Sequence, residues 1–199
     1  MALRSVQRSG DGAGVGWFLA GYVGLACFLA VEAIVREGGR ASSLEAGVDD
    51  RGSTGTIVIA SAAAATLAPL LRRAPIRPLP RSAGPAGLAM QAAGLGLRVW
   101  SMRTLGASYS RTLRADEEQR VVDDGPYGVI RHPGYLGSLL TWTGFGLTTG
   151  SLPAAGAVAG LLGLAYGRRI AAEEELLRRD LPGYPEYSRR TRRLIPFIW

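Results

Sequence analysis

The chain has 199 residues, of which 47% are hydrophobic, and a mean hydropathy of +0.12. Its formal net charge is +7, and all 23 basic residues are arginine. The charges are unevenly placed and leave long stretches nearly charge-free, which argues against a soluble domain and favours an all-helical integral membrane protein. The basic excess favours anionic membrane lipids over nucleic acid as partners, because no nucleic-acid-binding signature is present. One cysteine and one histidine, Cys27 and His132, exclude an intramolecular disulfide, and we expect no metal site.

Three apolar runs in the first half of the chain predict membrane spans. The first, Val15 to Val35, is long enough to cross a hydrocarbon core of about 30 Å, and it is too long for a typical signal peptide, so we interpret it as retained. The second is Thr56 to Leu71. Ala74 to Pro85 holds four prolines, which predicts a non-helical connector. The third and weaker span, Ala86 to Trp100, is rich in small residues that suit close helix packing.

The second half of the chain predicts a helical hairpin between two polar segments. Gly134 to Gly150 and Ala154 to Tyr166 are apolar and joined by a tight connection, so the total is about five spans. The hairpin returns the chain to the membrane face it left, which brings the polar segments 102–133 and 168–199 together. We therefore divide the chain into N-terminal spans, 1–101, and a core, 102–199, that holds a pocket formed by both polar segments.

The membrane orientation follows from charge and composition. The arginine-rich C-terminal tail favours the cytoplasmic side, although the arginines between residues 72 and 81 then fall outside, against the positive-inside rule. Heavy use of alanine, glycine and arginine resembles a GC-rich bacterial genome. We therefore expect a multi-pass bacterial inner-membrane protein whose site faces the cytoplasm.

The first candidate site lies around the histidine. Asp124-Gly125-Pro126-Tyr127 predicts a turn, and Pro133 is suited to be the first residue of a helix. A helix N-terminus at the membrane surface, beside Arg131 and His132, suits a carboxylate or a phosphate. Taken alone, the same residues also fit an interfacial turn with aromatic anchors.

The second candidate site is a charged pair on the last long helix. Arg169 and Glu173 are four residues apart and therefore share a helix face. By itself this spacing favours an ordinary surface ion pair, worth about 0.3–0.5 kcal/mol. The functional alternative is that both charges face the site and bind different ligands.

Together the two pieces resemble the isoprenylcysteine carboxyl methyltransferase family and its bacterial relatives, within a wider group that includes phospholipid methyltransferases. The resemblance covers roughly residues 100–199. The matching motifs are Val121-Val122, Gly125-Pro126-Tyr127, Arg131-His132-Pro133-x-Tyr135-x-Gly137, Glu173-Glu174-x-Leu176-Leu177, Leu181-Pro182-Gly183-Tyr184-x-Glu186-Tyr187 and Leu194-Ile195-Pro196.

The resemblance implies S-adenosylmethionine as the cofactor, S-adenosylhomocysteine as its product, and a lipophilic or lipidated methyl acceptor. The residues implied to contact the cofactor are Gln119, Arg120, Val121, Val122, Tyr127, His132, Pro133, Gly134, Tyr135 and Glu173. Arg169 is implied to bind the acceptor carboxylate, which makes Arg169 and Glu173 the catalytic pair. Family members often have histidine where this chain has Gln119, so a side-chain contact there is in doubt. No glycine-rich loop follows a strand, so the soluble Rossmann type of methyltransferase is excluded.

Other functions compete with carboxylate methylation. The acceptor could be a phospholipid amine or a small thiol, since prenylated proteins are not expected in most bacteria. Some membrane reductases that bind a nicotinamide cofactor resemble this chain in their C-terminal region. The short length of the chain and its Glu-Glu pair argue against a reductase. A non-catalytic scaffold for anionic lipid explains the arginines but leaves the two motifs a coincidence.

Overall fold

The protein is described here by a computed structural model that covers residues 2–37, 52–73, 78–106 and 121–195. Within the first helix, side chains are described from residue 14 to residue 34. The long helices are α1 (Ala2–Glu37), α2 (Ser53–Arg72), α3 (Ala83–Leu105), α4 (Pro133–Thr148) and α5 (Leu152–Asp180). Two short elements complete the described part, the 3-10 turn η2 (Gly125–Gly128) and α6 (Tyr184–Arg190). The all-helical fold class is confirmed.

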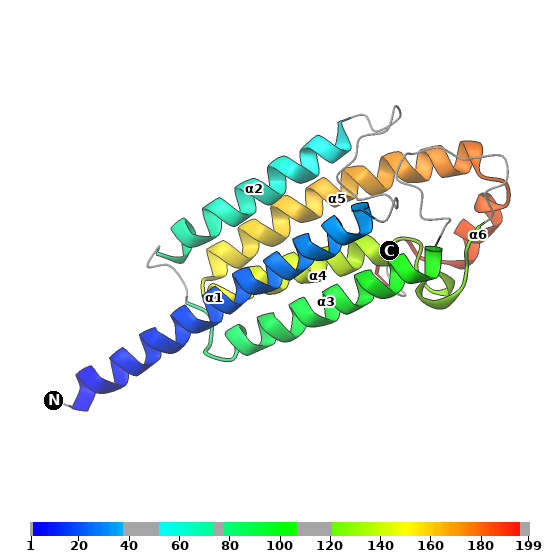
Figure 1. Cartoon of the computed structure of the whole chain (residues 1–199). Helices are drawn as coiled ribbons and strands as arrows, with labels where there is room; N and C mark the ends of the chain where they lie inside the picture. The colour runs from blue at the N-terminus through cyan, green and yellow to red at the C-terminus, as the bar shows by residue number, and fades with distance from the viewer. Residues whose placement is uncertain (1, 38–51, 74–77, 107–120, 196–199) are drawn as a thin grey trace.

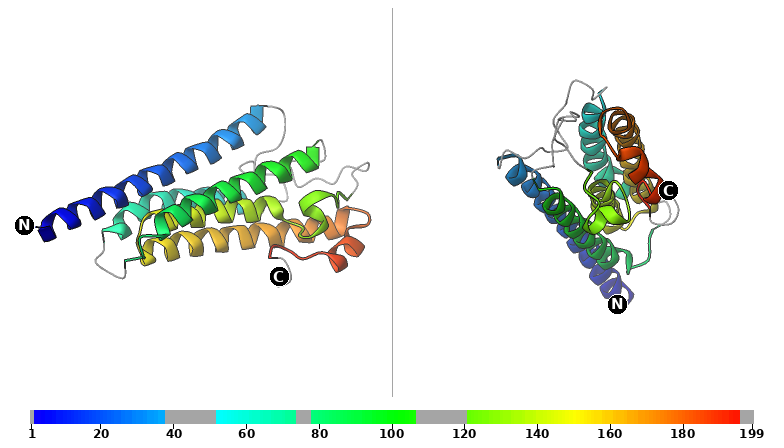
Figure 2. Two further views of the ribbon diagram at one scale, coloured as in Figure 1. Left: turned by 90° about the horizontal axis from the view of Figure 1, so that it is seen from below. Right: turned by 90° about the vertical axis from the view of Figure 1, so that its right-hand side faces the viewer.

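The long helices form an elongated bundle with their axes roughly aligned (Figures 1 and 2). The packed pairs are α3 with α4, α2 with α5, and α4 with α5, while α1 lies against α3 and α4. The N-terminal end of α1 protrudes beyond the other helices at one end of the bundle, and η2 and α6 gather at the opposite end (Figure 1). The predicted hairpin is α4 and α5, and it returns the chain to the end that holds η2.

Glycines allow α3 and α4 to approach until their backbones touch. A Cβ atom on Gly94 would lie 2.5 Å from the carbonyl oxygen of Gly137, and one on Gly87 would lie 2.5 Å from that of Gly144. No side chain fits at such distances, so these positions require glycine. The small residues of the third apolar run therefore serve close helix packing, as the sequence predicts.

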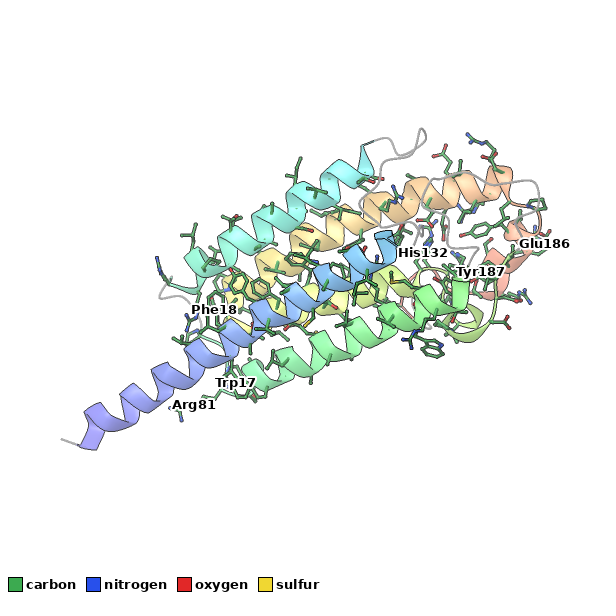
Figure 3. The ribbon with its side chains drawn as sticks, in the orientation of Figure 1. Trp17, Phe18, Arg81, His132, Glu186 and Tyr187 are labelled. Atoms are coloured by element: carbon green, nitrogen blue, oxygen red, sulfur yellow. The ribbon has the colours of Figure 1, made fainter. Side chains whose placement is uncertain are left out.

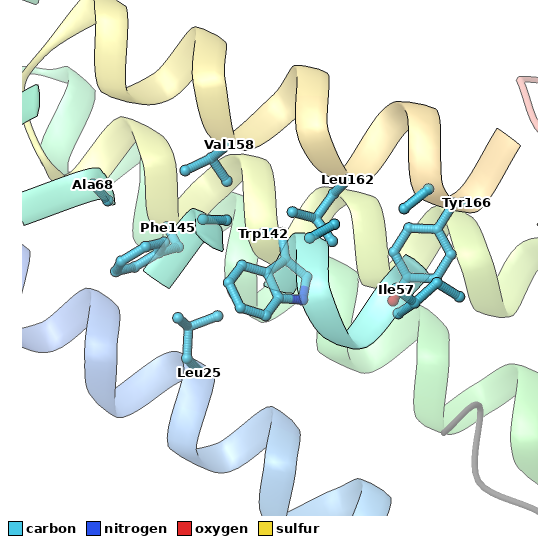
Figure 4. Packing of buried hydrophobic residues seen from close by; sticks show 11 residues of the cluster. Leu25, Ile57, Ala68, Trp142, Phe145, Val158, Leu162 and Tyr166 are labelled. Carbon is cyan, nitrogen blue, oxygen red and sulfur yellow. The ribbon is translucent and has the colours of Figure 1, made fainter. Parts of the chain in front are cut away.

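A hydrophobic cluster in the middle of the bundle joins α1, α2, α4 and α5. Phe145 and Leu162 are fully buried at its centre, with Trp142 and Ile57 beside them (Figure 4). Phe145 also packs edge-on against Tyr22 of α1, with ring centroids 4.9 Å apart. The cluster fixes how α5 lies against α2 and α4, and thereby where the polar end of α5 lies.

Apolar side chains also cover much of the outer surface of the bundle. Val23 of α1 is 63% exposed, Ile59 of α2 is 71% exposed and Leu164 of α5 is 74% exposed. Within the described ranges, two segments, Gly14–Ile34 and Ser53–Arg72, are long and apolar enough to cross a membrane. At 16 residues α4 is about 24 Å long, which is short for a span. The number of membrane spans stays a prediction.

The connector between α2 and α3 is shorter than expected, whereas the end of α5 lies where the sequence places it. The connector expected over Ala74 to Pro85 is wrong at its end, because α3 begins at Ala83 and takes Pro85 into its first turn. Proline is tolerated there because the first N–H groups of a helix have no partner within it. The last apolar run and the charged segment after it form one continuous helix, α5, which ends at Asp180, shortly before Gly183 with its φ of 81°.

Candidate active site

The two polar segments meet at one end of the bundle. His132 and Tyr187 lie there, whereas Trp17 and Arg81 lie at the other end (Figure 3). The backbone of residues 129–132 runs beside residues 191–193: Arg131 N–H donates to the carbonyl of Arg192 at 2.7 Å, and His132 N–H donates to that of Arg193 at 3.0 Å. The chain after α6 therefore returns across the turn that precedes α4. The predicted helix start at Pro133 is confirmed.

Glu174 lies at the centre of a group of charged side chains at this end of the bundle. Its side chain is fully buried and accepts hydrogen bonds from Arg131 Nε at 2.7 Å, from Arg193 Nε at 2.9 Å and from Arg178. His132 Nε2 lies 3.4 Å from Glu174 Oε1, within ion-pair distance but outside hydrogen-bond geometry. Burial acts to raise the pKa of Glu174, but His132 and Arg131 outweigh it and hold that pKa well below the ordinary carboxyl value.

Arg131 ties this carboxylate to the C-terminal segment. Besides its bond to Glu174, its guanidinium donates to the carbonyl oxygen of Ser188 at 3.0 Å and to that of Thr191. One buried arginine therefore joins the turn before α4, helix α5 and the end of α6. The sequence motifs contain both residues, but sequence reasoning placed Arg131 beside an anion site for a ligand and assigned no role to Glu174, the carboxylate that Arg131 meets.

Tyr135 connects the two candidate motifs. Its hydroxyl donates a hydrogen bond of 2.5 Å to Glu173 Oε2 and accepts one of 3.2 Å from Arg169 Nε. Arg169 Nε lies 4.0 Å from the same Glu173 oxygen. The first turn of α4 and the charged part of α5 thus share one polar cluster, as the predicted meeting of the two segments requires.

Arg169 is not a surface residue. It is only 4% exposed, so the interpretation as an ordinary surface ion pair is wrong. Its guanidinium reaches the start of α2, where Arg169 Nη1 donates to Ser53 Oγ at 3.0 Å and to Thr54 Oγ1 at 3.3 Å. Sequence reasoning missed both hydroxyls, because they lie more than 110 positions away and just before the apolar run that predicts the second span.

Aromatic rings line the same region. The rings of His132 and Tyr135 stack with centroids 5.7 Å apart, and Tyr166 follows with its centroid 5.5 Å from that of Tyr135. His132 is buried, and within the described ranges its Nε2 makes no hydrogen bond. A buried imidazole nitrogen, neighbouring aromatic rings and the carboxylate of Glu173, which is a quarter exposed and accepts hydrogen bonds, form a set of polar and ring groups that could contact an adenosyl group.

The remaining candidates lie against α6. Tyr187 donates to the backbone carbonyl of Tyr127 at 2.7 Å, and burial raises the pKa of Tyr187 to about 12. Val121 packs against Leu181, Tyr184 and Tyr187. Val122 is half-buried beside it, whereas Gln119 and Arg120 lie outside the described residues.

A buried ion pair between α1 and α3 contacts the start of α4. Arg98 of α3 donates to Glu32 of α1 at 2.5 Å and to the carbonyl oxygen of Gly134 at 3.0 Å. A charged side chain inside each of two apolar runs is the sequence signal for such a pair, because isolated charges are costly in a membrane. Within the described ranges, no group of three or more histidine, cysteine, aspartate or glutamate residues is placed to hold a metal ion.

Comparisons with known proteins agree with this architecture. The family model described as "Phospholipid methyltransferase" matches residues 84–181. A cobalt-zinc-cadmium resistance protein of Cupriavidus metallidurans is 31% identical over 121 residues, which are 61% of this chain and 51% of that protein. Protein-S-isoprenylcysteine O-methyltransferase B of Arabidopsis thaliana is 30% identical over 115 residues, which are 56% of this chain and 58% of that enzyme. The chain thus spans between half and three fifths of the length of these relatives.

A solved structure shares the fold. It is that of the eukaryotic intramembrane Ras methyltransferase, isoprenylcysteine carboxyl methyltransferase. The TM-score is 0.57 at 20% sequence identity, over 71% of this chain and 52% of that one. The expected resemblance, drawn from the motifs in residues 100–199, is confirmed.

Proposed function

We propose, on the premise that this chain belongs to an isoprenylcysteine carboxyl methyltransferase-like family, that it transfers a methyl group from S-adenosylmethionine to a lipophilic acceptor that reaches the site from the membrane. The observation that carries the proposal is the contact between the two motifs, in which Tyr135 hydrogen bonds to both Glu173 and Arg169. Such a cluster gives one end of the bundle a carboxylate, a guanidinium and stacked rings within reach of one nucleotide-sized ligand.

The cofactor side is assigned to the turn before α4 and to α5. His132, Pro133, Gly134, Tyr135 and Glu173 would hold the adenosyl group, because they combine ring faces, backbone groups and a carboxylate that can accept hydrogen bonds from hydroxyls. Val121, Val122 and Tyr127 extend this surface towards α6, and Gln119 and Arg120 belong to the same proposal.

The acceptor side is assigned to Arg169. A guanidinium binds a carboxylate through two parallel hydrogen bonds, which fix both position and direction. When bound, S-adenosylmethionine would supply an electrophilic methyl group on a sulfonium. A carboxylate acceptor is already ionised at neutral pH, so the protein needs no general base and gains rate by aligning the reactants and excluding water. The small number of catalytic side chains, Arg169 and Glu173, fits this chemistry.

A phospholipid amine is the second candidate acceptor, and the match to the phospholipid methyltransferase family model favours it. A protonated amine must lose a proton before it attacks a methyl group. Arg169 is a poor partner for such a group, so Glu173 or His132 would have to take the proton. The identity of the acceptor therefore decides which of these side chains is essential.

Cofactor binding is tested by calorimetric titration of the detergent-solubilised protein with S-adenosylmethionine and S-adenosylhomocysteine. Glu173→Ala is expected to weaken binding at least fivefold, because a hydrogen bond to a charged group is worth more than about 1 kcal/mol. Glu175→Ala, its exposed neighbour on α5, is the matched control. Absence of saturable binding by the unaltered protein with lipid present would refute the proposal.

Acceptor binding is tested by transfer of labelled methyl groups into a bacterial membrane extract, followed by identification of the labelled product. Arg169→Ala is expected to spare cofactor affinity and abolish transfer to a carboxylate. Arg168→Ala, which alters the exposed arginine next to it, is the control. Full transfer by the Arg169 variant would show that the site assignment is wrong, and a labelled phospholipid amine would select the second candidate.

A further inference from the structure

An arginine inside the third apolar run reaches the turn that is assigned to the cofactor. Arg98 of α3 is only 1% exposed, and its Nη1 donates a hydrogen bond of 3.0 Å to the carbonyl oxygen of Gly134. Ser138 Oγ donates to the same oxygen at 3.2 Å. Gly134 lies in the first turn of α4, so the guanidinium contacts the backbone of a segment that is proposed to hold the adenosyl group.

Helix α1 supplies the groups that hold this guanidinium. Arg98 Nε donates to Glu32 Oε1 at 2.5 Å, and the guanidinium carbon lies 5.7 Å from the centre of the Phe28 ring. Phe28 and Glu32 are four residues apart and therefore share a face of α1. Because the guanidinium is rigid and planar, bonds on Nε and on Nη1 fix both its position and its orientation.

Close packing of α3 on α4 brings the arginine to this carbonyl. A Cβ atom on Gly137 would lie 2.8 Å from the backbone nitrogen of Arg98, so the two helices touch at this point. A Cβ atom on Gly134 would lie 3.4 Å from Arg98 Nη1. Glycine at both positions therefore lets Arg98 lie directly against the start of α4.

Stability alone is a poor explanation for this ion pair. Charges are costly within apolar helices, and a buried pair can often be replaced by apolar side chains without loss of stability. Gln91 joins the same two helices by a neutral bond: it lies seven residues earlier on α3, and its Nε2 donates to the carbonyl oxygen of Gly21 at 3.1 Å. Arg98 adds a bond to the backbone of α4, which a neutral link between α1 and α3 does not require.

We propose that Arg98, with its charge balanced by Glu32, is a positioning residue for the cofactor. It fixes the carbonyl group of Gly134, and with it the backbone and rings of residues 132–135. The inference rests on the proposed function, and it gives α1 and α3 a part in cofactor binding. Glu32 lies outside the segment matched by the family model.

The test compares two changes at the ion pair with one control. Arg98→Met removes the bond to Gly134 and leaves Glu32 without that guanidinium. Glu32→Met combined with Arg98→Met removes the same bond together with both charges. Gln91→Met, the control, removes a buried polar contact between the same two helices. Each variant is titrated with S-adenosylhomocysteine by calorimetry, and its free energy of unfolding is measured in mixed micelles.

A positioning role separates cofactor affinity from stability. Arg98→Met is expected to be less stable and to bind S-adenosylhomocysteine about fivefold more weakly, as the loss of one hydrogen bond implies. The double variant is expected to regain stability, because no buried charge is left unbalanced, but not affinity. Gln91→Met is expected to lose stability and to keep its affinity within about twofold.

An affinity that recovers together with stability in the double variant overturns the inference and leaves the proposed function standing. The same conclusion follows if Gln91→Met weakens binding as much as the double variant does, because the effect would then be a general one of helix packing. Where Arg98→Met does not fold, the double variant and the control decide the question.

His132 gives a second readout that needs no ligand. It is the only histidine of the chain, so protein labelled with ¹³C-histidine gives a ring signal that needs no assignment. The shift of this signal depends on how the ring stacks on Tyr135, at a centroid distance of 5.7 Å. The double variant is expected to shift and broaden the signal, whereas Gln91→Met leaves it in place.

A histidine signal that does not respond in the double variant refutes the positioning role, whatever the affinities are. If the unaltered protein binds neither S-adenosylmethionine nor S-adenosylhomocysteine, the proposed function fails and the inference fails with it.

Discussion

Replacement of Glu174 by glutamine tests whether its buried charge stabilises the end of the bundle that holds η2 and α6. Glutamine has nearly the same shape as glutamate and keeps one oxygen that can accept a hydrogen bond, but it loses the charge. In the folded protein this carboxylate is fully buried and faces Arg131, which is only 7% exposed. Glu174→Gln therefore leaves a buried guanidinium without the negative charge that balances it.

The expected cost follows from burial. Breaking a buried ion pair by removing one partner costs about 3–5 kcal/mol, because the remaining charge stays desolvated. We expect about 3 kcal/mol for Glu174→Gln, at the lower end, because the amide oxygen still accepts one bond. Arg178 meets the same carboxylate from a side chain that is 43% exposed, so Arg178→Ala is expected to cost no more than about 0.5 kcal/mol.

The measurement is the free energy of unfolding in mixed micelles, obtained from a titration with dodecyl sulfate and followed by helical circular dichroism. Arg178→Ala is the control, because it removes one hydrogen bond to Glu174 without leaving a buried charge unbalanced. Equal stabilities of the two variants would refute the reasoning, since burial would then not decide the cost.

The same pair of proteins gives a pH test. The pKa of Glu174 is lowered in the folded state from an ordinary value of 4.5, so its stabilisation is complete above that value and is lost as pH falls through the lowered pKa. The difference in unfolding free energy between the unaltered protein and Glu174→Gln is expected to be constant from about pH 7 to about pH 5.5 and to shrink below 4.5. A difference that grows on acidification would contradict this sign.

Three other changes test neighbouring contacts. Arg98→Met leaves Glu32 buried without that guanidinium and is expected to lower the free energy of unfolding by about 3–5 kcal/mol in the same titration; an unchanged value would contradict the buried pair. Gly137→Ala places a Cβ atom 2.6 Å from the carbonyl oxygen of Gly94 and so overpacks the contact between α3 and α4. The expected destabilisation of about 1–3 kcal/mol is measured as a lower thermal midpoint, and an unchanged midpoint would argue against the close approach. Tyr135→Phe removes the hydroxyl that joins a carboxylate and a guanidinium of α5, so calorimetry is expected to show weaker binding of S-adenosylmethionine, and wild-type affinity would exclude this role.

Local signals account for the parts of the fold that the sequence predicts. The start of α4 at Pro133 follows from a fixed φ and a missing N–H, and the end of α5 follows from a proline and a glycine with positive φ. The hairpin requires only that two apolar runs be joined by a short connection. These features depend on a few consecutive residues, so composition and spacing are sufficient to place them.

Contacts between distant helices are harder to predict, because they depend on how each helix is rotated about its axis. Glu32 and Arg98 are 66 positions apart, and Arg169 and Ser53 are 116 apart. The sequence marks Glu32 as an unusual charge in a span but does not say which partner it meets. The burial of Arg169 likewise depends on α2, whose hydroxyls give no periodic signal.

These distant contacts bear on the proposed division into spans, 1–101, and core, 102–199. Arg98 donates to the carbonyl oxygen of Gly134, and its charge is balanced by Glu32 of α1. Arg169 is held by α2 in the same way, through Ser53. Both candidate sites of the core thus have a supporting contact in the first hundred residues. Orientation of the reactants is the main source of rate in the proposed chemistry, so these N-terminal contacts would affect methyl transfer by fixing groups of the core.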